Sequence, residues 1–454
     1  MPRNNAGAPQ KSRVIGNVIK GCLGNFIEWF DWFIYASFSI YFAASFFPAG
    51  NLTAQLLSTG VVFAVGFLMR PLGGWILGMY ADRYGRRNAL ALSVLLMSGG
   101  SLIIALTPSF ASIGIVAPIL LVAARLLQGL SVGGEFGSSA TYLSEIATPG
   151  KRGFYSSFQY VSIILGQLAA LLVMIVLQQL LTPAQMGDWG WRVPFVVGAV
   201  AGLVVMILRR GMDESEHFLI EKAGRESAGA AAKPTGSLRA LMQYPRQLLA
   251  VFGLALGGTV AFYVYTTYMQ KYMVNTAGIA KEDASVISFV ALLVFVFLQP
   301  LAGAFSDRYG RRKVMLFFSI GGTVATVPLL TLLSTTTNVF AAFGLMMVGL
   351  VFVTGYTALS AIVKAEMFPT KVRALGVGLP HAIVAALFGG TAEPIALALK
   401  QAGSESVFFW YVTGCIALTL VAAVMVKDPA KSSQLEADLQ NAEPAADSRA
   451  SVSA

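Results

Sequence analysis

The chain contains twelve apolar runs, each long enough to cross a lipid bilayer as a helix. A membrane-spanning helix needs about 20 mainly apolar residues to cross roughly 30 Å of hydrocarbon. Lipid offers the backbone no hydrogen-bond partners, so helices, which satisfy their own backbone groups, are the expected structure. The runs are 18–47, 56–80, 89–107, 113–137, 154–181 and 191–208 in the first half, and 248–274, 284–305, 314–333, 339–362, 372–399 and 407–426 in the second.

The composition supports an all-α membrane protein with twelve transmembrane helices. The chain is 56% apolar and 12% charged, with a mean hydropathy of +0.69, whereas soluble domains carry about 25% charged residues. No G-x-x-x-x-G-K-[ST] phosphate loop and no metal-ligand spacing is present, and the two cysteines, Cys22 and Cys415, form no disulfide framework. These absences argue against an enzyme or an ATP-driven pump, and we expect no cofactor.

Basic residues are concentrated in alternate loops. They follow the second, fourth, eighth and tenth runs and fill the long middle loop, while the other loops hold almost none. By the positive-inside rule, both termini and the middle loop are cytoplasmic. The formal charge of +10 is not gathered on a soluble domain, so nucleic acid is not an expected partner.

A repeat divides the chain into two halves of similar design. GMYADRYGRR at 78–87 recurs as GAFSDRYGRR at 303–312, and Glu145 and Arg152 recur as Glu366 and Arg373. Parallel repeats of this kind are typical of secondary transporters, whose binding site lies near the midplane between the halves. The expected organisation is a cytoplasmic tail (1–17), a six-helix bundle (18–208), a cytoplasmic linker (209–246), a second six-helix bundle (247–427) and a disordered cytoplasmic tail (428–454).

The repeated G-x-x-x-D-R-x-G-R-R pattern resembles the signature loop of the major facilitator superfamily. More narrowly, EWFDWFIYASFSIYFA, ARLLQGLSVGGEFGSSATYLSE, WGWRVPF and AEMFPTKVRALGVG resemble the metabolite:proton symporter family. This resemblance implies a multi-pass protein of the bacterial inner membrane that imports a dicarboxylate with protons. α-Ketoglutarate is the first candidate substrate. Another organic acid, such as citrate or a shikimate-like acid, or an osmolyte such as proline or betaine is the alternative.

The same resemblance implies that the repeated loops are cytoplasmic gates, made when the inside is closed and broken when it opens. Aspartates at helix ends can bind neighbouring helix termini, and arginines can bind the loop glutamates. The alternative, a role in topology alone, explains the arginines but not the placement of glycine and aspartate. The predicted gating residues are Asp82, Arg83, Arg86, Arg87, Glu145, Arg152, Asp307, Arg308, Arg311, Glu366 and Arg373.

Charged residues within the first and fourth runs indicate where the chemistry lies. Asp31 is 13 positions into its run and Arg125 is 12 positions into its run, so at about 1.5 Å per residue both lie near the midplane. An ionised side chain there costs about 2.5–3.5 kcal/mol. Arg125 either forms a buried ion pair with Asp31 or Glu28 that fixes helix packing, or it binds a substrate carboxylate and the released acid takes up a proton.

Other polar residues extend this predicted site. Glu28, Asp31 and Tyr35 share one helical face, and Glu135 is either a further proton site or is tied to a cytoplasmic arginine. The predicted proton-coupling residues are Asp31, Glu28 and Glu135. The predicted substrate-binding residues are Arg125, Tyr35, Gln128, Gln159, Gln167, Tyr263, Thr266, Gln270 and Lys364.

Several of these residues also have a purely structural interpretation. The glutamines of the fifth run can form hydrogen bonds between helices. Lys364 can extend to the cytoplasmic interface or bind a dianion, while Lys271 is expected to extend to the outer interface. His381 reads as a packing residue and Glu393 as a residue that shapes the helix or an outer gate.

Two further classes of membrane protein, a nutrient sensor and a drug exporter, fit the sequence less well. A nutrient sensor would usually need a signalling domain, for which the chain has no soluble segment of sufficient length. A drug exporter could work with acids alone, whereas an anion importer needs cations near the midplane such as Arg125. We therefore expect a transporter that functions as a monomer, with a small organic acid, protons and the lipid bilayer as its partners.

Overall fold

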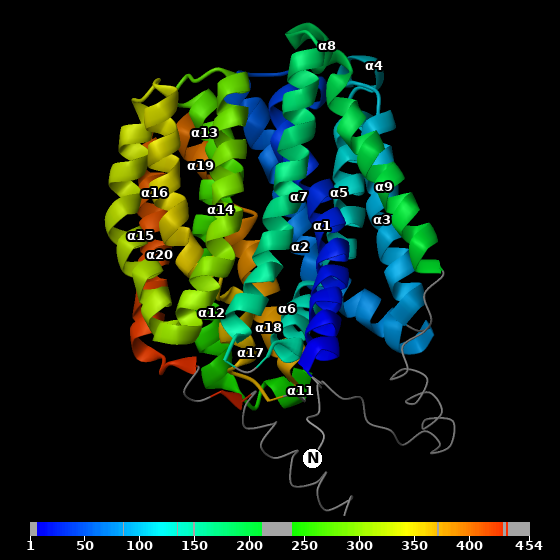
Figure 1. Ribbon diagram of the computed structural model, residues 1–454. Coiled ribbons are helices and arrows are strands. Elements are labelled where there is room, and N and C mark those ends of the chain that lie inside the picture. The colour runs from blue at the N-terminus through cyan, green and yellow to red at the C-terminus, as the bar shows by residue number, and fades with distance from the viewer. Residues whose placement is uncertain are drawn as a thin grey trace, which may run out of the picture.

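A computed structural model describes residues 7–84, 86–133, 135–148, 150–210, 238–369, 372–429 and 433–434. The regular secondary structure within these residues is helical (Figure 1). Eight of the described helices are long and apolar enough to cross a membrane, and three shorter apolar helices span Leu92–Leu106, Val116–Val132 and Gly190–Val204. The prediction of an all-helical membrane protein is therefore confirmed.

The first half of the chain forms long helices joined by short loops. Helix α1 begins at Gly7, earlier than the predicted start at Val18. The helix therefore includes residues that were expected to form a tail. The helices are α1 (Gly7–Phe46), α2 (Leu52–Tyr84), α3 (Arg86–Leu106), α4 (Phe110–Ile113), α5 (Val116–Val132), α6 (Glu135–Ile146), α7 (Arg152–Leu180), α8 (Pro183–Asp188), η1 (Gly190–Arg192) and α9 (Val193–Arg210).

The second half repeats this pattern. Its helices are α11 (Leu238–Leu241), α12 (Pro245–Phe262), η3 (Tyr263–Tyr268), α13 (Met269–Asn275), α14 (Lys281–Tyr309), α15 (Arg311–Ser334), α16 (Val339–Thr357), α17 (Ser360–Ala365), α18 (Arg373–Val384), η5 (Ala385–Gly389), α19 (Ala392–Gln401) and α20 (Glu405–Met425). The wider π-helical segments η3 and η5 interrupt two of these membrane spans. Such segments occur frequently at functional sites.

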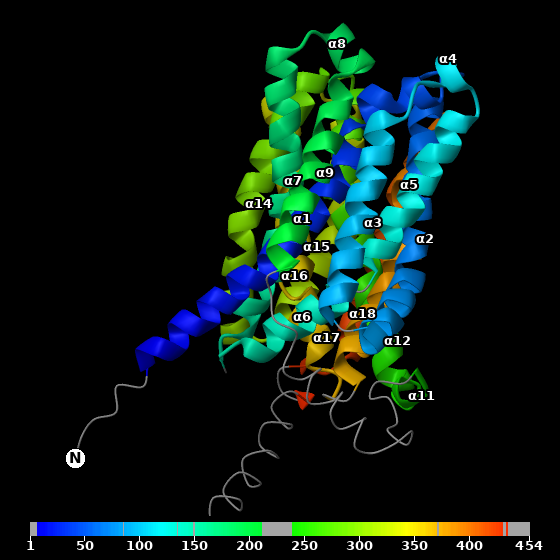
Figure 2. The same ribbon diagram turned by 90° about the vertical axis from the view of Figure 1, so that its right-hand side faces the viewer.

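The helices of the two halves lie on opposite sides of the molecule in Figure 1 and meet along two seams. Helices α7 and α14 lie side by side along one seam in both Figure 1 and Figure 2. Helix α2 packs against α18, η5 and α19 along the other seam. The two halves therefore contact each other along two lines of packed helices.

Small residues allow helices α2 and α5 to approach closely. A Cβ atom at Gly129 would overlap the carbonyl oxygen of Gly66, and one at Gly133 would overlap the carbonyl oxygen of Arg70. The two backbones are therefore in direct contact, as expected for small residues at four-residue spacing. This close contact places side chains of α2 and α5 next to one another within the first half.

Candidate functional site

A hydrogen-bonded group in the first half joins Arg125 to Asp31 through Gln128. Arg125 Nη1 donates to Gln128 Oε1 at 2.8 Å, and Gln128 Nε2 donates to Asp31 Oδ2 at 2.9 Å. Ser101 Oγ donates to the other Asp31 oxygen. The side chains of Arg125 and Asp31 do not form the direct ion pair considered from the sequence. Instead, an amide that can exchange partners lies between the cation and the acid.

A second buried arginine, Arg70 on α2, lies beside this group. The guanidinium carbons of Arg70 and Arg125 lie 4.3 Å and 4.0 Å from the centre of the Trp32 ring. Trp32 itself is fully buried. Cations over an indole face are stabilised by its quadrupole, so Trp32 can hold two like charges near one another. We call Arg70 and Arg125 the arginine pair.

Both members of the arginine pair keep hydrogen-bond donors without an acceptor. Nε and Nη2 of Arg70, and the same two atoms of Arg125, have no hydrogen-bond partner among the described residues, although both side chains are buried. Buried N–H groups normally have partners, and an unsatisfied charged donor costs more than a neutral one. The two guanidinium forks therefore offer the geometry that a carboxylate can accept in bidentate fashion.

The aromatic surroundings of the arginine pair come from both halves. The Tyr35 ring lies 4.4 Å from the Arg125 guanidinium carbon, and the Tyr35 hydroxyl donates to the Thr59 carbonyl oxygen at 2.9 Å. From the second half, Tyr263 in η3 interacts with Arg70, which also interacts through charge with Glu28. Of the three residues predicted on one face of the first helix, Asp31 and Tyr35 therefore accompany Arg125, while Glu28 accompanies Arg70.

Lys364 forms a separate buried group in the second half. Its ammonium donates to Ser360 Oγ at 2.8 Å and lies 3.0 Å from His381 Nδ1. The His381 ring stacks on Phe136 of the first half, with 3.9 Å between ring centres. Lys364 is only 1% exposed, so it does not extend to the interface, and no described carboxylate pairs with it. His381 makes both a packing contact and a polar contact.

The remaining predicted substrate-binding residues lie along the contacts between helices. Gln167 Nε2 donates to the Thr266 carbonyl oxygen across the two halves at 2.8 Å, whereas the Thr266 hydroxyl donates to its own helix at Phe262. The backbone carbonyl oxygen of Gln159 accepts a hydrogen bond from Asn25 Nδ2. Gln270 Nε2 donates to Ser285 Oγ at 3.0 Å, away from the arginine pair. The observed contacts of these residues are hydrogen bonds within or between helices, as expected for residues with a purely structural role.

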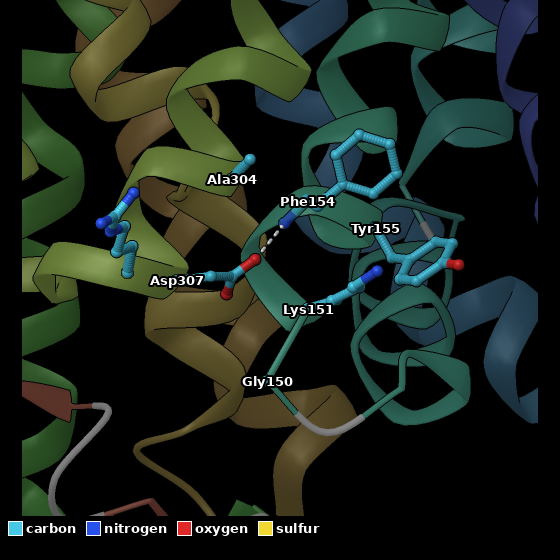
Figure 3. A pocket seen from close by; sticks show the side chains of 7 residues that line it. Gly150, Lys151, Phe154, Tyr155, Ala304 and Asp307 are labelled. Carbon is cyan, nitrogen blue, oxygen red and sulfur yellow. Dashed lines mark hydrogen bonds between the residues drawn. The ribbon is translucent and has the colours of Figure 1, made fainter.

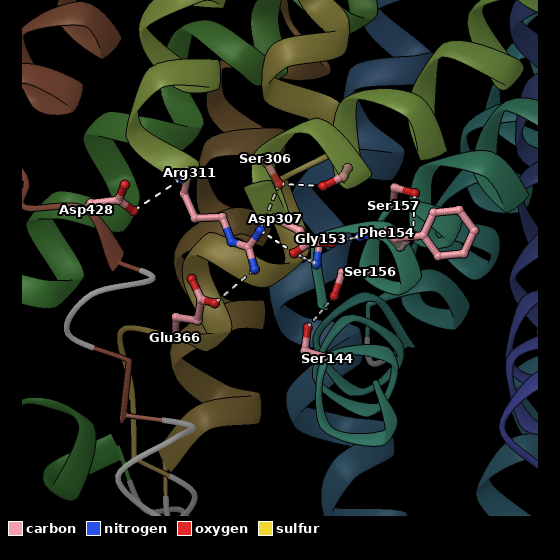
Figure 4. Close-up of polar contacts among 11 residues, drawn as sticks. Ser144, Gly153, Phe154, Ser156, Ser157, Ser306, Asp307, Arg311, Glu366 and Asp428 are labelled. Carbon is pink, nitrogen blue, oxygen red and sulfur yellow. Dashed lines mark hydrogen bonds and ion pairs between the residues drawn. The ribbon is translucent and has the colours of Figure 1, made fainter. Parts of the chain in front are cut away.

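Next to the repeated loop of the second half, Asp307 caps a helix of the first half (Figure 4). Its two carboxylate oxygens accept from the backbone nitrogens of Gly153 and Phe154, at 2.7 and 2.9 Å. Arg311 joins Asp307 at 2.6 Å and Glu366 at 3.4 Å. We call these five residues the latch. An anion at a helix N-terminus is stabilised by the free N–H groups and the helix dipole.

Two features extend the latch. Asp428 Oδ1 accepts from the backbone nitrogen of Arg311 at 3.3 Å, and Gln434 N donates to the Glu366 carbonyl oxygen at 3.0 Å. The chain after Asp428, expected to be disordered, therefore contacts the latch at Gln434. Burial raises the pKa of the Glu366 carboxyl, which lies just beyond its membrane span, and the charge of Arg311 opposes that shift.

A hollow of about 380 Å³ adjoins the latch (Figure 3). Figure 3 shows Lys151 and Tyr155 on the side of the first half and Ala304 and Asp307 on the other. Arg308 also lines this hollow, but its side chain is exposed and takes no part in the latch hydrogen bonds. Arg308 therefore lies outside the latch, whereas Arg311 lies within it, and the gating roles of both residues stay predictions.

Six of the predicted gating and proton-coupling residues have side chains that the structure does not describe. The side chains of Asp82, Arg83, Arg86, Arg87, Glu135 and Glu145 lie outside the described side chains. Arg152 and Arg373 are described and buried, and Arg373 Nε donates to the Phe368 carbonyl oxygen at 3.1 Å. Within the described residues, no group of three or more histidine, cysteine, aspartate or glutamate side chains could hold a metal ion.

Comparison with known families now identifies the chain. The family model of the Major Facilitator Superfamily matches residues 21–379 and 270–446. The chain belongs to the Major Facilitator Superfamily. This assignment confirms the resemblance carried by the repeated loop motif, and it identifies a transporter rather than an enzyme.

Curated members of the superfamily share sequence over nearly the whole chain. Alpha-ketoglutarate permease of Escherichia coli K12 is 49% identical over 93% of this chain and 96% of its own. The citrate-proton symporter of Klebsiella pneumoniae is 34% identical over 85% of this chain and 86% of its own. The proline/betaine transporter of Escherichia coli K12 is 31% identical over 90% of this chain and 82% of its own.

Solved structures show the same Major Facilitator Superfamily fold. A crystal structure of a D-xylose-proton symporter superposes with a TM-score of 0.70, covering 91% of this chain and 98% of that chain at 18% identity. The partially occluded inward-open xylose transporter of E. coli superposes with a TM-score of 0.67, covering 92% and 98% of the two chains at 18% identity. At this identity the likeness describes the fold alone.

The residue that sequence reasoning missed in this superfamily member is Arg70. It interrupts the second apolar run within FLMRPLGG, and an arginine inside a membrane span is a signal of function by the same argument as Arg125. Its distance from Arg125 in the sequence concealed that the two share Trp32. Trp32 is the tertiary link between them.

Proposed function

We propose that the chain is a proton-coupled symporter that imports a dicarboxylate, with α-ketoglutarate as the best candidate, across the bacterial inner membrane. Alternating access between two six-helix bundles carries the substrate. We further propose that twelve helices span the membrane with both termini and the linker 209–246 in the cytoplasm, and that the chain works as a monomer. The alternate loops rich in arginine and lysine support that topology.

The observation that carries this proposal is the arginine pair with its unpartnered donors. Two guanidinium groups from α2 and α5 approach one tryptophan, and each keeps Nε and Nη2 available. A carboxylate accepts two parallel hydrogen bonds from one such fork, so a dicarboxylate can engage two forks. The relative with 49% identity, named alpha-ketoglutarate permease, supports the same substrate class.

Arg125 and Asp31 supply a route for coupling. Gln128 donates to Asp31 and accepts from Arg125. A change in the hydrogen bonds of the Arg125 guanidinium can therefore alter those of the Asp31 carboxylate through one side chain. When a substrate carboxylate binds Arg125, it offsets the positive charge that favours ionised Asp31. Proton uptake by Asp31 then accompanies substrate binding. Glu28 beside Arg70 is the second candidate for the same exchange.

Proton coupling also has an energetic reason. A dianion that enters an inside-negative cell moves against about 2.3 kcal/mol per charge per 100 mV. Two protons carried with the dianion make the cycle electroneutral. Glu28 interacts with Arg70 through charge, and Asp31 interacts with Arg125 in the same way, so two acids lie near two cations, as two protons per substrate would require.

The alternatives differ in the charge that the site must bind. Proline and betaine carry no net charge, and binding either one needs a cation for the carboxylate and a site for the positively charged nitrogen. The arginine pair, together with the buried ammonium of Lys364, favours a substrate with two carboxylates. Citrate and other organic acids share that chemistry, and the 34% identity to a citrate-proton symporter keeps them as the second candidate.

The test is uptake of labelled α-ketoglutarate into proteoliposomes that hold the purified chain. We expect accumulation when the outside is acidic, and loss of accumulation when a protonophore collapses the gradient. Unlabelled dicarboxylates should compete, whereas proline and betaine should not. Equal accumulation with and without a pH gradient would contradict the coupling. Competition by betaine but not by dicarboxylates would contradict the substrate class.

A further inference from the structure

Two helices of the second half are interrupted near the same depth. The segment η3 separates α12 from α13, and η5 separates α18 from α19. The two interruptions touch, because a Cβ atom at Gly389 would approach the Tyr263 ring to 2.8 Å. Each interruption leaves a short outer helix, α13 or α19, beyond it.

A buried ion pair joins these two outer helices. Lys271 Nζ on α13 lies 2.6 Å from Glu393 Oε1 on α19, and the two side chains are 2% and 5% exposed. The lysine therefore does not extend to the outer interface, as the sequence suggested, but turns inward to the glutamate. Taking two charges out of water is costly, so such a pair is weak evidence for added stability. A geometric role is the better explanation for its presence.

The ion pair lies against the first half of the molecule. A Cβ atom at Gly60 of α2 would lie 3.3 Å from Glu393 Oε1. Tyr35 of α1 and Tyr268 of η3 also lie near Glu393. The other carboxylate oxygen, Glu393 Oε2, has no hydrogen-bond partner among the described residues. The pair thus sits where the outer helices of one half meet helices of the other.

A neighbouring contact crosses the same boundary. Thr53 Oγ1 near the start of α2 donates to Asn275 Oδ1 at the end of α13, at 3.3 Å. Helix α13 therefore contacts the first half directly, and α19 packs on α2 along its length. Through the ion pair, a movement of either outer helix must carry the other.

We propose that Lys271 and Glu393 are positioning residues that join α13 and α19 into one unit, which closes the outer end of the transport path by packing on α2. The interruptions η3 and η5 are the hinges of this unit. The inference rests on the proposed transport function but concerns the outer closure, not substrate binding. Breaking the pair separates the two outer helices and opens the outer side.

The test compares four variants in a background with Cys22 and Cys415 replaced by serine. They are Glu393→Gln, Lys271→Met, the charge reversal Lys271→Glu with Glu393→Lys, and the control Glu282→Gln. Glu282 is an exposed acid at the outer end of α14, so its variant makes the same chemical change without touching the pair. The reporter is Thr53→Cys, labelled by a membrane-impermeant maleimide on right-side-out vesicles.

We expect each single variant to raise the labelling rate at position 53 about tenfold, which corresponds to about 1.4 kcal/mol, and to lower uptake. The charge reversal should restore both towards the parent values, because it rebuilds the pair in the opposite order. The control should leave both unchanged. A merely structural loss would lower protein yield without restoration by the charge reversal.

Two results would overturn the inference. The first is unchanged labelling at position 53 in the single variants, and the second is a well-folded charge reversal that stays as open as the single variants. Uptake by the parent protein is measured in the same vesicles. Absence of α-ketoglutarate uptake there would count against the proposed function, while the labelling result would still decide the role of the pair.

Discussion

Asp307 Oδ1 accepts a hydrogen bond from the backbone nitrogen of Gly153 over 2.7 Å. Asp307 ends α14 in the second half, and Gly153 begins α7 in the first, so this bond crosses between the halves. The glycine of the repeated motif explains how helices α14 and α7 come so close, because the backbones of Gly303 and Gly153 are in contact. The glycine and the aspartate of GAFSDRYGRR therefore each make a defined contact between the two halves.

Asp307→Asn should weaken closure of the cytoplasmic side. The amide keeps one acceptor oxygen but loses the charge that stabilises the N–H groups of Gly153 and Phe154. Hydrogen bonds to charged groups contribute about 1.5–3 kcal/mol, so we expect roughly a tenfold or larger shift towards the inward-open state. Labelling of a cysteine introduced at Ser157 in inside-out vesicles measures it. Arg308→Gln, next in sequence but exposed, should behave like the parent.

Arg70→Lys should weaken substrate binding while the protein still inserts. Lysine keeps the charge but loses the planar fork that binds a carboxylate through two hydrogen bonds. We expect the concentration for half-maximal uptake to rise by about 10- to 100-fold, as the loss of about 1.5–3 kcal/mol predicts. Arg312→Lys, where the arginine binds helix carbonyl oxygens instead, is the matched control. Equal affinity in both variants would remove Arg70 from the site.

Asp31→Asn should separate transport from proton coupling. Asparagine resembles the protonated acid in shape and can still accept from Gln128 or Ser101. We expect exchange of labelled for unlabelled substrate to continue, while accumulation driven by a pH gradient falls to background. Counterflow and gradient-driven uptake in the same proteoliposomes distinguish the two. Gradient-driven accumulation at the parent level would assign the proton to another acid.

Two adjacent glycines on α3 provide a test of packing. A Cβ atom at Gly100 would approach Gln128 Cγ to 2.6 Å and the Ala124 carbonyl oxygen to 2.9 Å, whereas one at Gly99 would meet nothing within 4 Å. Gly100→Ala should therefore destabilise the protein by about 1–3 kcal/mol and displace Gln128. Gly99→Ala should be neutral or stabilising by up to about 1 kcal/mol. Thermal unfolding in detergent, with uptake alongside it, gives the comparison.

Much of the fold could be predicted because its causes are local in the sequence. The apolar runs follow from the lipid that surrounds the helices, and the repeated loops follow from the similarity of the two halves. Arg125 stands out because a cation within an apolar run is costly. Helix interruptions at η3 and η5 were not predicted, because the residues of FYVYTTY are compatible with a continuous apolar helix. The break after Val132 was likewise hidden within the run 113–137.

Which residues meet was decided by tertiary structure. The sequence by itself determined that the chain is a helical membrane protein built in two similar halves, with a buried arginine and acids near the midplane. Only the packing of α2 on α5 through Gly129 and Gly133 placed Arg70 with Arg125 at Trp32, and only the meeting of α13 and α19 turned Lys271 towards Glu393. Hydropathy reports the depth of a residue in the membrane, whereas the rotation of each helix about its axis depends on contacts with helices distant in the chain.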